Sequence, residues 1–248
     1  MPVHYSGDPS GIRKINSFAR KNRIRVVEDA AHAFGSTYNN KLIGSFGDIA
    51  CFSFDGIKNI TCGEGGAIVT NDSQIIIKAS DIRTLGIIGD SKRRTAKQRS
   101  WSFDIVEQGY RYHMSDINAA IGVIQLKRFS SFQKKRKLLA KNYDANFANS
   151  AFIKVFKRNY DEITPHIYAV RLAKPESREE LQKYLLSNGI QTGYHYFPNH
   201  LLTFFKKKGE ELPEIENIFP SLLTLPTHTG VTKKNSIYIA KTINSFYS

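Results

Sequence analysis

The first third of the chain alternates between helical and strand-like patterns. A helical pattern over 11–20 is followed by the run IRVVEDA at 24–30, which predicts a short buried strand that ends in two carboxylates. Two more short apolar runs bounded by glycines, at 48–54 and 65–71, predict further strands, and a helical pattern resumes at 73–86. Alternation of this kind is typical of an α/β layered domain.

The middle of the chain predicts one or two long helices. Over 115–148, Ser115 is placed to act as the N-cap and Asp116 lies in the first turn. Apolar residues are spaced along one face of this region: Ile117, Ile121, Ile124, Phe129 and Phe132. A helix of this length suits a bridge between two domains.

The last hundred residues predict a smaller α+β domain. The pattern indicates a strand at 166–173, a helix with a glycine stop at 177–189, a strand at 190–196 and a closing helix at 233–247. We therefore expect two domains, a larger one over 1–149 that includes the long helix and a smaller one over 150–248.

Charge and composition restrict the partners. Lys and Arg exceed Asp and Glu by 36 to 22, which favours an anionic partner such as a phosphorylated small molecule, a nucleotide or a nucleic acid. The basic runs at 90–99, 134–137 and 206–208 are not interleaved with the aromatic residues that stack on bases, so solvated surfaces are favoured over nucleic-acid binding.

Other classes of protein and site are disfavoured as well. No apolar run approaches the roughly 20 residues of a membrane span, and the N-terminus lacks the pattern of a signal peptide, so a cytoplasmic protein is expected. Cys51 and Cys62 fit no zinc spacing and are interpreted as small buried hydrophobic residues, so no metal site is predicted.

One lysine, Lys58, lies in a short turn between the second and third predicted strands, within CFSFDGIKNITCGEGGAIVTND. A lysine in such a turn, close to a carboxylate at a strand end, could hold an aldehyde cofactor as a Schiff base. Pyridoxal phosphate also needs an acid near its ring nitrogen. A carboxylate about 4 Å away contributes roughly 4 kcal/mol at an effective dielectric near 20, enough to keep that nitrogen protonated at neutral pH.

Several motifs in order carry a resemblance to a known family. VVEDAAHAFGS, GSFGDIACFSF, KN and GEGGAIVTND, followed downstream by GYRYHMSDINAAIGVIQL, GIQTGYHYFPNHLL and LTLPTHTGVT, resemble the DegT/DnrJ/EryC1/StrS family of pyridoxal-phosphate-dependent sugar aminotransferases. The resemblance implies an α/β, aspartate aminotransferase-like (type I) fold with an incomplete large domain and a smaller C-terminal α+β domain. It implies pyridoxal 5'-phosphate as the cofactor.

The resemblance also implies roles for individual residues. Lys58 would form the Schiff base and shuttle the proton, and Asp29 would pair with the ring nitrogen. His32 would contact the phenolic oxygen and Ser53 the phosphate. Arg111 stands where the family usually has an asparagine that reaches the partner's cofactor phosphate across a homodimer.

Each of these roles has a structural alternative. His32 could be a core histidine, Ser53 a plain strand serine and Lys58 a surface lysine, while Arg111 could meet the substrate instead of the phosphate. Glu28, beside Asp29, is expected to face the protein interior or solvent and not the cofactor.

The family's usual substrates suggest transfer of an amino group from glutamate to a nucleotide-diphospho keto sugar. Among such sugars, the 4-keto-6-deoxy sugars of surface polysaccharides are favoured. His195, His200 and the basic segment at 92–99 are the candidate substrate contacts, with domain packing and a solvated loop as their alternatives. A dehydratase of the same family is disfavoured, because that branch carries a histidine where this chain has Lys58.

The resemblance leaves part of the family pattern unmatched at the N-terminus. Family chains begin with about 100 further residues, which carry the opening strands, a phosphate-binding loop and an aromatic residue that stacks on the cofactor. We expect an unpaired sheet edge and uncovered apolar faces as a result. The alternatives are a fragment of a longer product, an enzyme completed by a separate N-terminal fragment, or an inactive or complementing fragment.

Overall fold

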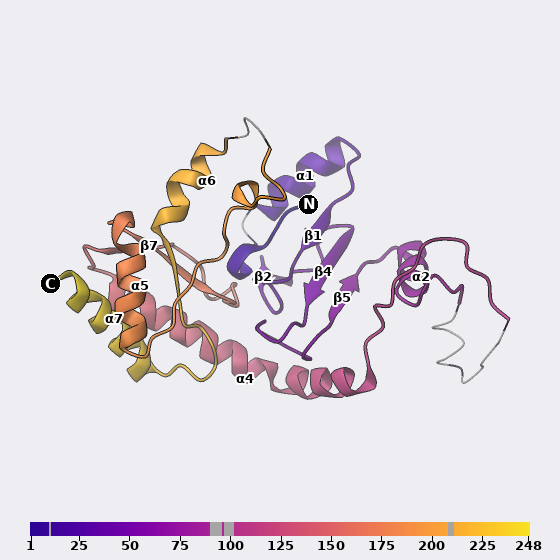
Figure 1. The fold of residues 1–248 in the computed structure, drawn as a ribbon. Helices are drawn as coiled ribbons and strands as arrows, with labels where there is room; N and C mark the ends of the chain where they lie inside the picture. The colour runs from indigo at the N-terminus through magenta and orange to yellow at the C-terminus, as the bar shows by residue number, and fades with distance from the viewer. Residues whose placement is uncertain (10, 90–95, 97–101, 208–210) are drawn as a thin grey trace. The chain divides into compact units, whose positions relative to one another are not determined.

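The computed structural model describes residues 1–9, 11–89, 96, 102–207 and 211–248 (Figure 1). The chain forms two compact units, of which the first contains 1–5 and 9–129 and the second contains 6–8 and 130–248. The predicted assignment of 1–149 to a cofactor-binding domain and 150–248 to a small domain stays a proposal. Each unit is described in turn.

A three-stranded mixed sheet is the centre of the first unit. Its strands are β1 (Val27–Asp29), β4 (Ile49–Ser53) and β5 (Gly66–Val69), in the order β1-β4-β5. β1 and β4 are parallel, with Asp29 opposite Cys51, whereas β5 runs antiparallel to β4 (Figure 1). The three strands predicted from the apolar runs are confirmed, each shorter than its run by one or more residues at either end.

Two helices and a small hairpin complete the regular structure of the first unit. The helices are α1 (Ile12–Lys21) and α2 (Ser73–Ile82), and both were predicted. The hairpin, β2 (Thr37–Tyr38) with β3 (Lys41–Leu42), was not predicted, because strands of two residues leave no periodic pattern.

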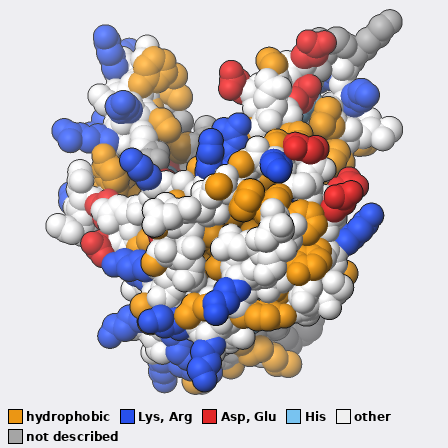
Figure 2. Space-filling model, turned by 90° about the vertical axis from the view of Figure 1, so that its left-hand side faces the viewer, with side chains coloured by type: hydrophobic (Ala, Val, Ile, Leu, Met, Phe, Trp, Pro, Cys, Tyr) orange, Lys and Arg blue, Asp and Glu red, His pale blue; other side chains and the backbone are white. Residues whose placement is uncertain are grey.

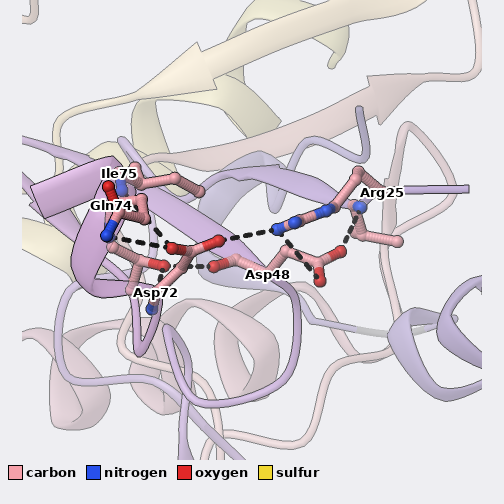
Figure 3. A network of polar contacts seen from close by, with 7 residues as sticks. Arg25, Asp48, Asp72, Gln74 and Ile75 are labelled. Carbon is pink, nitrogen blue, oxygen red and sulfur yellow. Dashed lines mark hydrogen bonds and ion pairs between the residues drawn. The ribbon is translucent and has the colours of Figure 1, made fainter. Parts of the chain in front are cut away.

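A polar network ties the start of α2 to the beginnings of β1 and β4 (Figure 3). The Asp72 carboxylate caps the helix by accepting the backbone N–H of Gln74 at 3.0 Å, and it also pairs with Arg25 at 3.3 Å. Asp48 accepts the backbone N–H of Val26 at 2.7 Å, so the same cluster holds the beginnings of β1 and β4. The ion pairs are exposed, and the backbone hydrogen bonds carry most of its stabilising effect.

The long central helix is continuous. α4 (Asp116–Phe147) has 32 residues, and Ser115 Oγ accepts the Asn118 N–H at 3.2 Å, which confirms the predicted N-cap. The predicted apolar face is exposed over the first turns, where Ile117 is 75% exposed. The buried side chains of α4 lie instead toward its C-terminal end: Arg136, Leu139, Ala140, Tyr143 and Phe147.

The second unit contains an antiparallel sheet with helices. Its strands are β6 (Ile153–Val155), β7 (Tyr168–Leu172) and β8 (Leu222–Leu225), with β7 in the middle. Its helices are α5 (Arg178–Ser187), α6 (Pro213–Ile218) and α7 (Lys233–Tyr247), of which α5 and α7 were predicted. Short 3-10 turns over both units lie at Tyr5–Gly7, Pro175–Ser177, Asn199–Leu201 and Phe219–Ser221.

One predicted strand in this unit is wrong. Segment 190–196 makes only an isolated bridge, in which Gly193 exchanges both backbone hydrogen bonds with Thr224 of β8. Most side chains around Gly193 are half-buried or exposed on both faces, so the segment lacks the one buried face that would fix a longer ladder.

The core of the second unit is mostly aliphatic and includes four aromatic residues, Tyr143, Phe147, Tyr160 and Tyr168. Tyr143 and Tyr168 are almost fully buried and their rings lie 4.7 Å apart. Tyr143 donates to Pro226 O at 2.9 Å and Tyr168 donates to Asp144 Oδ1 at 2.6 Å, so both hydroxyls are satisfied. Arg136 is buried beside this core, donates to His166 O and Thr227 O, and has its pKa lowered to about 10 by burial.

The surface reflects the basic composition. Figure 2 shows Lys and Arg side chains spread over the face drawn, with hydrophobic side chains between them. Within the described part of the chain, no helix combines the length and apolar character that crossing a membrane requires.

Candidate active site

The carboxyl ends of two parallel strands position three of the predicted site residues. Asp29 is the last residue of β1 and Ser53 the last residue of β4, and Lys58 lies in the turn that follows β4. Because β1 and β4 are parallel neighbours, their ends meet at one edge of the sheet. In α/β folds, ligands bind outside the carboxyl ends of such strands.

Asp29 is half-buried and held at its backbone and its carboxylate. Its Oδ1 accepts the N–H of Ala31 at 3.0 Å, and the next amide, Ala30 N–H, donates to Cys51 O at 2.9 Å. Burial raises the pKa of the Cys51 thiol, and the charge of Asp29 raises it further. The Asp29 carboxylate therefore lies close to β4 as well as at the end of β1.

His32 is buried in the turn that follows β1. It is 6% exposed, and its ring centroid lies 6.0 Å from that of Tyr5 at an angle of 50°. Its place, three residues beyond Asp29, is compatible with the predicted contact to a cofactor and equally with a core histidine. The contact stays a prediction.

The turn that carries Lys58 is closed by its own hydrogen bonds. Lys58 N–H donates to Asp55 O at 3.1 Å, and Asp55 Oδ1 accepts the N–H of Ile57 at 2.9 Å. Ser53 Oγ accepts the Asp55 N–H at 3.3 Å, which leaves the serine hydroxyl hydrogen available to another acceptor. Lys58 itself is half-buried, unlike a freely solvated surface lysine.

Asn59 joins the lysine turn to the segment that follows Asp29. Its Nδ2 donates to Phe34 O at 2.9 Å, and the side chain is 3% exposed. Its Oδ1 is buried and has no hydrogen-bond partner among the residues that the structure describes. The sequence offered only the dipeptide KN as a signal for this residue, and its role was not predicted.

An aromatic cluster supports the same junction. The Phe34 ring packs edge-on against Phe52 at 5.7 Å, Phe54 at 5.8 Å and Phe129 at 4.9 Å between centroids. Edge-to-face pairs of this kind contribute about 0.5–1.5 kcal/mol each beyond the area they bury. The end of β4 and the segment after β1 are therefore held together by packing as well as by the Asn59 hydrogen bond.

Two glycines beyond the turn are required by close packing. A Cβ on Gly65 would lie 2.6 Å from Cys62 Sγ and from Met114 Cε, and one on Gly66 would lie 2.6 Å from Phe52 O. These distances are shorter than any side-chain carbon tolerates. Close packing therefore accounts for glycine at positions 65 and 66.

Arg111 lies on a different segment of the first unit. It is exposed and forms an antiparallel bridge with Thr84, next to α2. The following residue but one, His113, lines a cavity of about 900 Å³ beside β5 and α2, together with Thr70, Ser80 and Arg83. The structure thus places Arg111 beside Thr84, just beyond the end of α2, and its reach to a partner's phosphate stays a prediction.

The two predicted substrate histidines belong to the second unit and have separate partners. His195 Nδ1 lies 3.1 Å from Thr224 Oγ1, whereas His200 Nε2 lies 2.9 Å from Glu216 Oε1. The pKa of Glu216 is lowered, first by the N–H of Leu212 and then by His200. The two imidazoles thus have different hydrogen-bond partners, and both roles stay predictions.

Two further expectations concern substrate and metal. The basic segment at 92–99, apart from Ala96, lies outside the described residues. Within the described ranges, no group of three or more His, Cys, Asp or Glu side chains could hold a metal ion.

Comparison with families of known proteins gives a match over nearly the whole chain. A family model described as the DegT/DnrJ/EryC1/StrS aminotransferase family matches residues 1–244. The UDP-4-amino-4,6-dideoxy-N-acetyl-beta-L-altrosamine transaminase of Campylobacter jejuni is 34% identical over 249 residues, which is 98% of this chain and 64% of that protein. The GDP-perosamine synthase of Escherichia coli O157:H7 is 33% identical, over 100% of this chain and 65% of that protein.

Solved structures match over a similar span. The sugar aminotransferase Spr1654 of Streptococcus pneumoniae in its PMP-form has a TM-score of 0.88 at 30% identity, covering 98% of this chain and 67% of that one. The same protein in its PLP-form has a TM-score of 0.87. This likeness confirms the predicted fold class. The chain spans about two thirds of the length of the curated relatives, 64% and 65% in the two cases above.

Proposed function

The chain belongs to the DegT/DnrJ/EryC1/StrS aminotransferase family, and from this premise we propose that it carries the cofactor site of a pyridoxal-phosphate-dependent sugar aminotransferase. The observation that carries the proposal is the hydrogen bond of 2.9 Å from Asn59 Nδ2 to Phe34 O. It supports the proposal because it ties the turn with Lys58 to the segment that follows Asp29. An amine and a carboxylate are thereby held at one edge of the sheet.

The side chains at this edge fit pyridoxal phosphate by their chemistry. When bound, the cofactor supplies an aldehyde for a lysine amine and a ring that withdraws electrons from the substrate carbon. We assign Lys58 to the aldehyde, Asp29 to the ring nitrogen, His32 to the phenolic oxygen and Ser53 to the phosphate. The buried, unpartnered Oδ1 of Asn59 agrees with a polar group beside Lys58 that the described chain does not provide.

Two residues would carry the proton chemistry. The Asp29 carboxylate holds a proton on the ring nitrogen, and at about 4 Å this attraction is worth roughly 4 kcal/mol at an effective dielectric near 20. Lys58 Nζ would move the proton between the reacting carbon of the substrate and the carbon that carries the cofactor's aldehyde. Proton transfer by a positioned side chain typically contributes 10²–10⁴-fold in rate.

The substrates follow from the relatives and from the charge. We propose that the amino group comes from glutamate and goes to a nucleotide-diphospho keto sugar of surface polysaccharide biosynthesis, with a 4-keto-6-deoxy sugar favoured. The two relatives named above are a UDP-sugar transaminase and GDP-perosamine synthase, and the chain's net charge of +14 favours an anionic substrate. His195 and His200 are the proposed substrate contacts.

The assembly is part of the same proposal. We place the protein in the cytoplasm as a homodimer in which Arg111 reaches the partner's cofactor phosphate, where a guanidinium gives a charge-assisted bond. The alternative is that this chain is an inactive or complementing piece of such an enzyme, because it spans 64% of its Campylobacter relative.

The experiment is an absorbance titration of the purified chain with pyridoxal phosphate. We expect a band near 410–430 nm, roughly where lysine-bound cofactor absorbs, that Lys58→Ala abolishes. Lys14→Ala is the matched control, since Lys14 is an exposed lysine on α1 of the same unit. A band that survives in Lys58→Ala contradicts the assignment of Lys58. The absence of any band in the folded wild-type chain favours the incomplete-enzyme alternative.

A further inference from the structure

Glu28 is a fully buried carboxyl group that the proposed chemistry does not use. Its side chain is 0% exposed, and both of its oxygens have partners. Oε2 lies 2.7 Å from His4 Nε2, and Oε1 accepts the backbone N–H of Gly47. Because a carboxyl group is buried at a high cost unless its oxygens are hydrogen-bonded, this arrangement indicates a specific role for the side chain.

His4 is attached to β1 twice. Its backbone N–H donates to Asp29 O at 3.0 Å, and its imidazole, 2% exposed, pairs with Glu28. Asp29 N–H in turn donates to Pro2 O at 2.8 Å, and Val3 forms a parallel bridge with Asp29. Segment 2–4 therefore adds to β1 at Asp29 itself, and the His4–Glu28 pair fixes its register.

Gly47 brings a third segment onto the same carboxyl group. A Cβ at this position would lie 2.7 Å from Glu28 Oε1, so the backbone of the turn before β4 closes directly on the carboxylate. β4 then runs on to Ser53 and the lysine turn. Glu28 thus joins segment 2–4, the end of β1 and the entry to β4.

Glu28 does not itself face the ligand edge occupied by Asp29. Successive side chains of a strand point to opposite faces, so Glu28 and Asp29 lie on opposite sides of β1. The burial pattern of β1 agrees, because Glu28 is buried between two half-buried neighbours, Val27 and Asp29. Any effect of Glu28 on the chemistry must therefore act through the backbone.

We propose that Glu28 is a positioning residue for Asp29, which through His4 and the Gly47 N–H fixes the end of β1 and so holds the Asp29 carboxylate toward the cofactor's ring nitrogen. This inference rests on the proposed function for its ligand. The part of the inference that concerns the structure, the fixing of β1 by Glu28, rests only on contacts within the first unit. It gives the two carboxylates of the EDA motif different roles: Glu28 fixes the end of β1, and Asp29 contacts the cofactor.

The first test measures amide hydrogen exchange of the full chain without cofactor. In Glu28→Ala, we expect exchange of peptides covering 27–31 to rise about tenfold or more, with less than about threefold change in α1, because opening is local when one brace is removed. His4→Ala should loosen the same peptides. Glu28→Gln can keep both hydrogen bonds and should restore protection. Ile12→Val, a buried change in α1 at a residue 1% exposed, is the control for general destabilisation.

The second test titrates the same variants with pyridoxal phosphate. We expect Glu28→Ala to weaken binding about tenfold or more, since small displacements of a positioned group have large effects. We also expect it to shift the absorbance maximum of the bound cofactor in the same direction as Asp29→Asn. Glu28→Gln should stay within about threefold of the wild type, and Ile12→Val should bind and absorb as the wild type does.

The outcomes separate the inference from the proposed function. Uniformly raised exchange across the first unit in Glu28→Ala, or an unshifted spectrum with wild-type affinity, overturns the positioning role. If Glu28→Ala does not fold, His4→Ala and Glu28→Gln decide by the same two readouts. If the wild-type chain binds no pyridoxal phosphate, the proposed function fails, and the exchange measurement alone decides whether Glu28 braces β1.

Discussion

Replacement of Asn59 by alanine should weaken both the fold and the cofactor site. The substitution removes the 2.9 Å hydrogen bond to Phe34 O from a side chain that is 3% exposed. A buried hydrogen bond contributes about 0.5–1.5 kcal/mol, and a carbonyl left without its donor costs about 1–3 kcal/mol. Removal of the unpartnered Oδ1 offsets part of this loss, so we expect a net loss of about 1–2 kcal/mol.

Asn22→Ala is the matched control for this substitution. Asn22 Nδ2 also donates to a phenylalanine carbonyl, Phe18 O, at 2.8 Å, but the bond is exposed and water can replace it. We expect a change below about 0.5 kcal/mol. Urea unfolding followed by circular dichroism measures both variants against the wild type.

The same variants test whether Asn59 holds the lysine turn for the ligand. If the free energy lost in the turn is also lost from binding, about 1–2 kcal/mol lowers the affinity for pyridoxal phosphate about 5- to 30-fold, as measured by absorbance titration. Asn22→Ala should bind as the wild type does. The reasoning is refuted if Asn59→Ala unfolds and binds like the wild type, or if Asn22→Ala loses as much.

Three further predictions concern stability. Backbone N–H groups, that of Gln74 first, hold the pKa of the Asp72 carboxyl below its usual value. The carboxylate therefore stabilises the fold above its unfolded pKa, and this effect is lost as the pH falls through its folded pKa. The unfolding midpoints of Asp72→Ala and the wild type should converge in acid. Burial raises the pKa of Asp144 while the Tyr168 hydroxyl opposes this, so Tyr168→Phe should cost about 1 kcal/mol at pH 7 and less as the pH falls through the folded pKa and the carboxyl takes up a proton; a loss that does not change with pH contradicts this. Leu181→Ala, at a 0% exposed core position, should cost about 2–5 kcal/mol by urea unfolding, and a loss below 1 kcal/mol would contradict the assigned core.

Strong local patterns account for what the sequence predicts of the fold. The closing helix has the bounds that its pattern indicated, Lys233–Tyr247, because a capping box at Thr232 and Asn235 fixes its start. The strands that end at Asp29 and Ser53 were likewise found from apolar runs bounded by glycines and carboxylates. The strand expected at 190–196 is absent because the segment lacks the one buried face that would extend the bridge at Gly193 into a ladder.

Contacts between distant residues account for what the sequence does not predict of the site. The proximity of Asp29 to the lysine turn could be expected, since parallel neighbours end at one edge. The Asn59 bond to Phe34 spans 25 positions and the His4 bond to Glu28 spans 24, and no local pattern indicates either. Glu28 was expected to face either the interior or solvent, and the structure decides for the interior.

The most direct test of the account is chemical trapping of the cofactor on the chain. Purified protein is incubated with pyridoxal phosphate, reduced with borohydride and digested, and the labelled lysine is located by mass spectrometry. The account predicts a single major label on Lys58, reduced in Asp29→Asn and in Asn59→Ala. A label spread over surface lysines, or one concentrated on a lysine outside the turn after β4, contradicts it.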